Sequence, residues 1–261
     1  MRKSLLMLLL ISLTSPVLAA PFSICDYFAG KSGCFLLYNP NQNSLLTQYN
    51  PARCGERLSP NSTFKVPLSL MAFDQKLISQ KSVFKWDGKD KGLAVWNQNQ
   101  TPYTWLENST VWVSQDLAAK LGENKIKNYL IKFNYGNQNN SAPNFWLDSR
   151  LAISADEQLA FMKALLANKL PVSKEAVSNT KANMYLETSP HGWRLYGKTG
   201  TSQKTNDGKS QGWFVGFIEK ADQIYIFVLN FSDLQDPKTS EGAGSRAKEI
   251  TKTLLTKMNL F

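Results

Sequence analysis

Histidine and cysteine are scarce in this chain of 261 residues, which contains one histidine, His191, and three cysteines. No two cysteines have the Cys-x-x-Cys spacing of a zinc site, and a single histidine adds little to a metal cluster. The sequence therefore argues against a metal centre. His191 lies between Pro190 and Gly192, which predicts a loop. No Gly-x-Ser-x-Gly motif marks the nucleophile of a serine-histidine-aspartate enzyme.

Long apolar runs are also absent beyond the first 20 residues, which argues against a transmembrane helix. Residues 1–20 combine Arg2 and Lys3 with an apolar run and then small residues, the pattern of a secretory signal peptide. We expect cleavage near Ala19 and a secreted chain, periplasmic in a bacterium. No cysteine directly follows the signal, so we expect no lipid anchor and no membrane anchor.

Acidic residues are few, with 20 Asp and Glu against 30 Lys and Arg, and the formal net charge is +10. The charge falls to +8 when the two cations Arg2 and Lys3 leave with the signal. The lysines are spread along the chain and do not form one stripe with aromatic partners. We therefore expect no nucleic acid partner, and we interpret the charge as solubility and attraction of small anions.

The three cysteines, Cys25, Cys34 and Cys54, fall in the first quarter of an exported chain. Export allows oxidation, so one disulfide with one thiol left over is expected. Any of the three pairs satisfies the sequence. Residues 20–261 are long enough to bury a core as one domain with two lobes.

The apolar pattern runs from strands to helices and back to strands. Alternation predicts strands at 34–38 and 45–49, and a high content of aromatic and β-branched residues predicts strands at 193–197, 212–218 and 223–231. Helical spacing predicts helices at 113–121, 123–133, 155–166, 173–186 and 242–258. The fold class is α/β of the α+β type: an antiparallel sheet flanked by terminal helices, with an inserted helical lobe. We expect the sheet lobe at about 20–60 and 190–261 and the helical lobe at about 61–189.

Ser62 and Lys65 form a Ser-x-x-Lys motif, which predicts acyl transfer. A helix that begins near Asn61 places both side chains on one face, within reach of each other. Three further matches occur, at Ser82/Lys85, Ser178/Lys181 and Ser245/Lys248. Those matches lie in polar, lysine-rich stretches typical of solvated faces. Ser62 alone follows a Pro-Asn helix start and precedes the mostly apolar run 66–73, so we assign it as the nucleophile.

Lys198-Thr199-Gly200 is a second motif, and Lys31-Ser32-Gly33 is a weaker match to the same pattern. Ser62 falls where the chain enters the helical lobe, and Lys198 lies on a strand after the chain returns. We therefore expect both motifs at the junction of the two lobes. A cleft would lie there, because pockets often form at such junctions. Acyl transfer also needs a base, and burial lowers the pKa of a lysine so that Lys65 can act as a neutral amine.

Three short motifs lie between these two: Ser109-Thr110-Val111, Tyr135-Gly136-Asn137 and Phe145-Trp146-Leu147. With Ser-x-x-Lys, Lys-Thr-Gly and an arginine at a terminal helix, this order closely resembles the class D, oxacillinase-type serine β-lactamases. The resemblance spans nearly the whole mature chain. It implies the serine β-lactamase and penicillin-binding-protein fold, a small β-lactam such as a penicillin as substrate, and a monomer or homodimer.

The resemblance implies that an acyl group forms on Ser62 and that Lys65 is carboxylated to give the general base. Carbon dioxide or bicarbonate would supply this carboxyl group, and no other cofactor or metal is implied. Trp146 would donate its indole N–H to the carbamate. Val111 and Leu147 would form apolar walls that keep the site dry.

The same resemblance implies roles for residues across the cleft. Ser109 and Lys198 would pass a proton to the lactam nitrogen, and the backbone N–H groups of Ser62 and Thr201 would form the oxyanion hole. Thr199 and Arg246 would hold the substrate carboxylate. The substrate-binding residues expected are Thr199, Gly200, Thr201, Arg246, Val111 and Leu147.

Two loop features complete the expected site. Tyr135, Gly136 and Asn137 are assigned a cleft-shaping role, although Gly-Asn also favours an ordinary turn. Ser149 stands where many class D enzymes have glycine, which indicates a different loop after Trp146.

Two alternatives share the acylation step. A penicillin-binding peptidase is disfavoured by the apolar setting of Trp146 and by Ser109-x-Val111 in place of Ser-x-Asn. A β-lactam sensor domain, which would be acylated without turnover, is disfavoured because it would need a membrane anchor.

Overall fold

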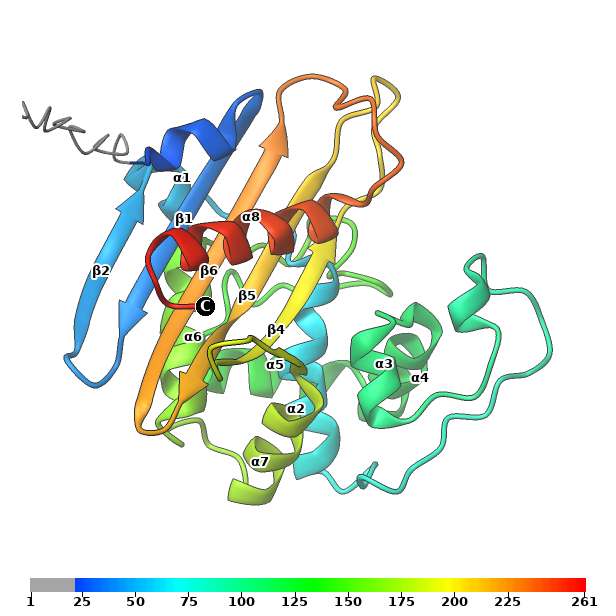
Figure 1. Cartoon of the computed structure of the whole chain (residues 1–261). Coiled ribbons are helices and arrows are strands. Elements are labelled where there is room, and N and C mark those ends of the chain that lie inside the picture. The colour runs from blue at the N-terminus through cyan, green and yellow to red at the C-terminus, as the bar shows by residue number, and fades with distance from the viewer. Residues whose placement is uncertain (1–21) are drawn as a thin grey trace, which may run out of the picture.

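A single antiparallel sheet with the strand order β2-β1-β6-β5-β4-β3 forms the framework of the computed structural model, which describes residues 22–261 (Figure 1). The strands are β1 (Lys31–Asn39), β2 (Ser44–Tyr49), β3 (Tyr185–Thr188), β4 (Arg194–Thr201), β5 (Gln211–Lys220) and β6 (Gln223–Asp233). The first strands therefore pair with the last ones, and the helical segment is inserted between them, as the sequence predicts.

Both faces of the sheet are buried, which explains the nearly continuous apolar strands. In β5, Trp213, Val215 and Phe217 belong to the core on the helical side, whereas Phe214 and Ile218 belong to the core on the opposite side. Successive strand residues point to opposite faces, so a strand covered on both sides has no polar face to alternate with.

The helix α8 (Ala243–Lys257) lies across one face of the sheet and packs on β5, β4 and β6 (Figure 1). The short 3-10 helix η1 (Ile24–Phe28) contributes to the same core layer through Phe28. The residues of α8 that bury against the sheet are Ala243, Gly244, Ala247, Thr251, Leu254 and Leu255.

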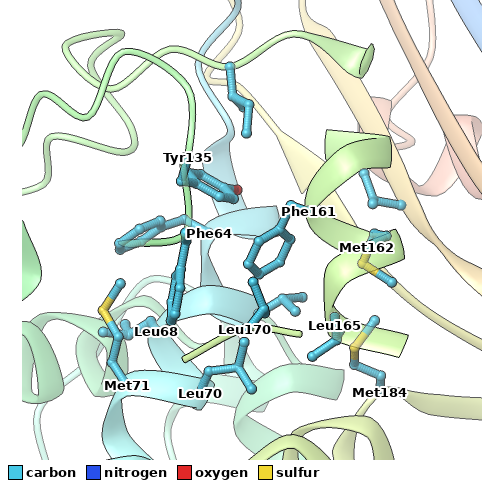
Figure 2. Close-up of a cluster of buried hydrophobic side chains, with 14 of the residues drawn as sticks. Phe64, Leu68, Leu70, Met71, Tyr135, Phe161, Met162, Leu165, Leu170 and Met184 are labelled. Carbon is cyan, nitrogen blue, oxygen red and sulfur yellow. The ribbon is translucent and has the colours of Figure 1, made fainter. Parts of the chain in front are cut away.

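The remaining helices lie on the other face of the sheet and beside it (Figure 1). They are α1 (Pro51–Gly55), α2 (Lys65–Asp74), α3 (Pro102–Glu107), α4 (Val111–Leu121), α5 (Glu123–Lys132), α6 (Ala155–Leu166) and α7 (Lys174–Asn183), with 3-10 helices η2 (Asn61–Phe64) and η3 (Ala94–Trp96). Figure 2 shows Phe64, Tyr135 and Phe161 meeting in this core, which fixes η2 and the start of α2.

One predicted boundary is wrong. The expected helix 173–186 ends at Asn183, and Tyr185–Thr188 forms strand β3 on the edge of β4. Tyr185 packs edge-on against Tyr196 with ring centroids 5.6 Å apart. Pairing with β4 therefore overrides the helical spacing of these residues.

Cys34 and Cys54 form the disulfide, which joins β1 to α1, and Cys25 is exposed and unpaired. This settles the pairing that the sequence left open. No helix within residues 22–261 is both long and apolar enough to cross a membrane. The predicted signal peptide and its cleavage site at Ala19 lie outside the described residues.

Candidate active site

Ser62 lies in η2, one turn before α2, at the edge of the helical core. Its side chain is partly exposed, whereas every residue of α2 from Lys65 to Phe73 is buried. The 3-10 turn continues into the helix, so Ser62 and Lys65 are separated by one turn. The Lys65 Nζ donates a hydrogen bond to Ser62 Oγ at 3.3 Å. The structure thus brings the predicted nucleophile and base together.

Lys65 is buried with 1% of its surface exposed, and no carboxylate forms an ion pair with it among residues 22–261. Burial, and then the positive charge of Lys198, lower the pKa of Lys65 well below its ordinary value of 10.5. Both effects disfavour the ammonium form. A neutral amine beside the serine hydroxyl is the form that can accept a proton.

Trp146 lies against this lysine-serine turn. Its ring stacks on Phe64 with centroids 5.4 Å apart, and its backbone carbonyl accepts hydrogen bonds from Asn61 N at 3.0 Å and Ser59 Oγ at 2.9 Å. The indole Nε1 is buried and has no hydrogen-bond partner among residues 22–261. A buried donor without an acceptor is costly, so this position favours an additional acceptor in the working site.

Lys198 reaches Ser109 from β4 and is also buried. Its Nζ donates hydrogen bonds to Ser109 Oγ at 2.6 Å, Thr199 O at 3.2 Å and Thr199 Oγ1 at 3.3 Å. Burial, and then the charge of Lys248, lower the pKa of Lys198 to about 7. Both of its protonation states are therefore populated at neutral pH.

Ser109 adopts a left-handed backbone, with φ of +56°, between α3 and α4. This conformation is unfavourable for a residue with a side chain and is often found at functional sites. It aims the hydroxyl at Lys198 and leaves Val111, the next but one residue, at the start of α4. Val111 and Leu147 are both partly buried.

The lowered pKa of Lys198 makes stability depend on pH. Between pH 7 and 10.5 the Lys198 amine holds a proton in the unfolded chain and releases it in the folded chain. The free energy of unfolding therefore rises with pH in this range, and it decreases again as the pH falls towards 7. The lowered pKa corresponds to a net penalty of about 5 kcal/mol on the charged form, which the loss of the amine removes. The same substitution loses three hydrogen bonds of roughly 1 kcal/mol each. We expect Lys198→Met to stabilise the fold at pH 6 by about 2 kcal/mol.

Urea unfolding at pH 6 and pH 9 measures this effect. The variant should gain more stability at pH 6 than at pH 9, and the exposed Lys132→Met is the matched control. Equal gains at both pH values would contradict burial of a charged Lys198.

Gly200 brings β4 close to η2. A Cβ at this position would lie 2.9 Å from Pro60 O and 3.2 Å from Thr63 Cγ2. The strand end, with Thr199 and Thr201, therefore passes beside the turn that carries Ser62. Thr201 Oγ1 accepts a hydrogen bond from Gly244 N at 2.9 Å, which joins this strand end to α8.

Arg246, which the resemblance assigns to the substrate carboxylate, is paired with a carboxylate of the protein in this structure. Its guanidinium donates to both carboxylate oxygens of Asp233 at 2.8 Å and to Ser210 Oγ at 3.2 Å, and its side chain is only 11% exposed. Burial raises the pKa of Asp233, but the Arg246 hydrogen bonds outweigh this and leave it below its ordinary value. The Arg246 guanidinium, whose planar shape suits a substrate carboxylate, is therefore already bound to the carboxylate of Asp233 on β6.

Tyr135, Gly136 and Asn137 clamp the loop that carries Trp146. Asn137 N donates to Ala152 O at 2.9 Å, its Oδ1 accepts from Ala152 N at 3.0 Å, and its Nδ2 donates to Arg150 O at 2.7 Å. Tyr135 is buried and its hydroxyl donates to Gln158 at 3.5 Å. The motif therefore holds the chain that follows Trp146, at Arg150 and Ala152.

We expect Gly136→Ala to destabilise the fold by about 2–4 kcal/mol, through left-handed strain and overpacking. Gly136 has φ of +56°, and an added Cβ would lie 2.2 Å from Ala152 O. Gly88 is the matched control, because it has φ of +78° and open space around it. Gly88→Ala should cost about 1–2 kcal/mol by urea unfolding. Equal losses would contradict the clamp.

Ser149, the departure noted in the sequence, has φ of +68°. This is the left-handed region that glycine adopts without strain, so the chain keeps the turn with a residue less suited to it. The backbone N–H of Leu151 still donates to Phe145 O at 2.9 Å, and the loop around Trp146 stays closed.

The remaining candidates lie outside the site. His191 is exposed between β3 and β4, as predicted, and Ser178 is exposed on α7. Lys248 is different: the sequence assigns it to a solvated face, yet its charge reaches Lys198. Only the packing of α8 on β4 places it there, and no motif in the sequence indicates this.

Comparison with known proteins matches residues 33–256 to the penicillin binding protein transpeptidase domain. β-Lactamase OXA-1 of Escherichia coli is 44% identical, over 89% of this chain and 87% of that protein. Among solved structures, class D β-lactamase BAT-2 has a TM-score of 0.82 and 34% identity, over 92% of this chain and 97% of that chain.

The C-terminal domain of the Bacillus licheniformis BlaR penicillin-receptor has a TM-score of 0.84 and 33% identity, over 92% of this chain and 96% of that chain. The fold is therefore common to β-lactamases and a penicillin-receptor domain.

Proposed function

The chain belongs to the class D serine β-lactamases, and from this we propose that it hydrolyses the amide of penicillins through an acyl-enzyme on Ser62. The observation that carries the proposal is the buried Lys65, whose Nζ lies 3.3 Å from Ser62 Oγ and whose pKa is lowered by burial and by Lys198. No other group able to act as a base is hydrogen-bonded to Ser62 within residues 22–261.

In the first step Lys65 serves as the base that takes the proton of Ser62, and Ser62 Oγ bonds to the carbonyl carbon of the lactam. The carbon-nitrogen bond of the ring then breaks, and the nitrogen receives a proton from Ser109, which Lys198 resupplies across their 2.6 Å hydrogen bond. The pKa of Lys198, about 7, allows it to give and regain a proton at neutral pH. The backbone N–H groups of Ser62 and Thr201 are the proposed oxyanion donors.

We also propose that carbon dioxide carboxylates Lys65. The buried Trp146 Nε1 without a partner fits this group, because a carboxylate on Lys65 would give the indole an acceptor. Such a carboxylate supplies a base that can serve in both acylation and release of the product. Lys65 has 1% of its surface exposed, and a dry site favours the neutral amine that reacts with carbon dioxide.

Export to the bacterial periplasm is part of the proposal. The Cys34–Cys54 disulfide supports it, since disulfides persist in oxidising compartments. The predicted signal peptide at 1–19 supports the same destination.

A sensor domain is the second candidate, and the likeness to the BlaR receptor domain favours considering it. Mixing the purified chain with a 100-fold molar excess of a penicillin separates the two. We expect far more than one equivalent of hydrolysed penicillin, while intact mass shows an adduct that disappears once substrate is exhausted. A permanent adduct with one equivalent consumed would overturn the hydrolase and favour the sensor or a trapped peptidase.

A further inference from the structure

Arg246 and Lys248 lie on opposite flanks of α8. Two helical residues are separated by about 200° around the axis when they are two positions apart. Arg246 points towards β6, where it pairs with Asp233 and covers the ring of Phe231 at 5.0 Å. Lys248 therefore lies on the other flank, towards β4 and the cleft.

Independent contacts place this flank beside the substrate site. Gly244, one turn before Lys248, packs directly on Gly200, where a Cβ would lie 2.8 Å from the Gly200 carbonyl oxygen. Gly244 N also donates to Thr201 Oγ1 at 2.9 Å. The turn of α8 that carries Lys248 is thus anchored on the Lys-Thr-Gly end of β4.

The Lys248 amine has no strong partner of its own. Its nearest carboxylate, Glu249, lies 3.9 Å away, and the Lys248 side chain is 33% exposed. Its charge is close enough to Lys198 to lower the pKa of that lysine. Lys252, one turn further along the same flank of α8, pairs with Glu187 of β3 at 2.7 Å, and β3 pairs with β4, so this flank follows the edge of β4. No carboxylate among the described residues forms an ion pair with Lys198.

We propose that Lys248, together with Thr199, binds the carboxylate of the β-lactam substrate in place of Arg246, whose guanidinium is already paired with Asp233. This inference rests on the proposed function. An anion between Lys198 and Lys248 relieves their repulsion, which gives the carboxylate a reason to bind there. The site then selects substrates that carry a negative charge beside the lactam nitrogen.

Steady-state hydrolysis of a penicillin and of its methyl ester by Lys248→Ala tests the proposal. For the penicillin we expect KM to rise about tenfold with kcat within about threefold of wild type, whereas KM for the ester, which lacks the charge, should hardly change. Lys248→Arg should restore most of the loss. The matched control is Lys252→Ala, one turn further along α8, where Lys252 pairs with Glu187 at 2.7 Å.

The pH profile supplies a second readout. Removing the charge of Lys248 should raise the pKa of Lys198, so the limb of the kcat/KM profile near pH 7 should move to higher pH. Arg246→Ala should lower the melting temperature, because it leaves the buried Asp233 unpaired, with a smaller rise in KM than Lys248→Ala.

The proposal is overturned if Lys248→Ala leaves KM for the penicillin unchanged, or if Arg246→Ala raises KM more than Lys248→Ala does. Either result, obtained with an active wild type, leaves the hydrolase assignment intact. A wild type that does not hydrolyse the penicillin overturns the proposed function and this inference with it.

Discussion

Ser62→Ala should lower kcat/KM for a penicillin by at least about 10⁴-fold, because the variant has no oxygen at the position that receives the acyl group. Ser62 carries the only hydroxyl that Lys65 contacts in the described part of the chain. The fold should be unaffected, since the Ser62 hydroxyl is partly exposed and forms no other side-chain hydrogen bond there. Steady-state kinetics and intact mass after mixing with the penicillin measure the result.

Ser178→Ala is the matched control for this experiment. Ser178 also begins a Ser-x-x-Lys motif, but it lies exposed on α7. We expect wild-type activity and a normal acyl adduct from Ser178→Ala. An adduct of full size on Ser62→Ala would show that another residue is the nucleophile.

Lys65→Ala should lower kcat for the same penicillin by about 10³-fold, since the general base is lost while the nucleophile stays. Hydrolysis of the acyl group should suffer more than its formation, because water is a poor nucleophile towards an ester without a base. The acyl-enzyme should therefore accumulate and persist for hours by intact mass. This distinguishes Lys65→Ala from Ser62→Ala, which should show no adduct.

Lys181→Ala, the lysine of the Ser178 motif, is the control for the loss of a lysine in general. It should keep wild-type turnover. If Lys65→Ala hydrolysed the penicillin at the wild-type rate, the base would be a different group and the assignment of Lys65 would be wrong.

Much of the fold is readable from the sequence because its strands and helices have clear periods. The aromatic and β-branched residues of β5 and β6, and the helical spacing in α4 to α6, agree with the elements observed. Strand β3 is not readable, because only its pairing with β4 makes Tyr185–Thr188 extended. The pairing of Cys34 with Cys54 likewise depends on how α1 packs on β1.

Part of the candidate site is likewise readable from the sequence, and part depends on tertiary packing. Ser62 and Lys65 are neighbours in the sequence, so a helical turn suffices to bring them together. Their meeting with Ser109 and Lys198 follows from the ordered motifs and the family resemblance. Arg246 and Lys248 are two positions apart, and only the orientation of α8 decides that the first pairs with Asp233 and the second flanks β4.

The most direct test of the central claim, that the buried Lys65 amine carries a carboxyl group, is ¹³C NMR of the protein equilibrated with ¹³C-bicarbonate at pH 8. We predict one carbamate resonance in the wild type, none in Lys65→Ala, and a weaker one in Trp146→Phe, which lacks the indole donor. A wild type that hydrolyses a penicillin under these conditions without any carbamate resonance would contradict the account.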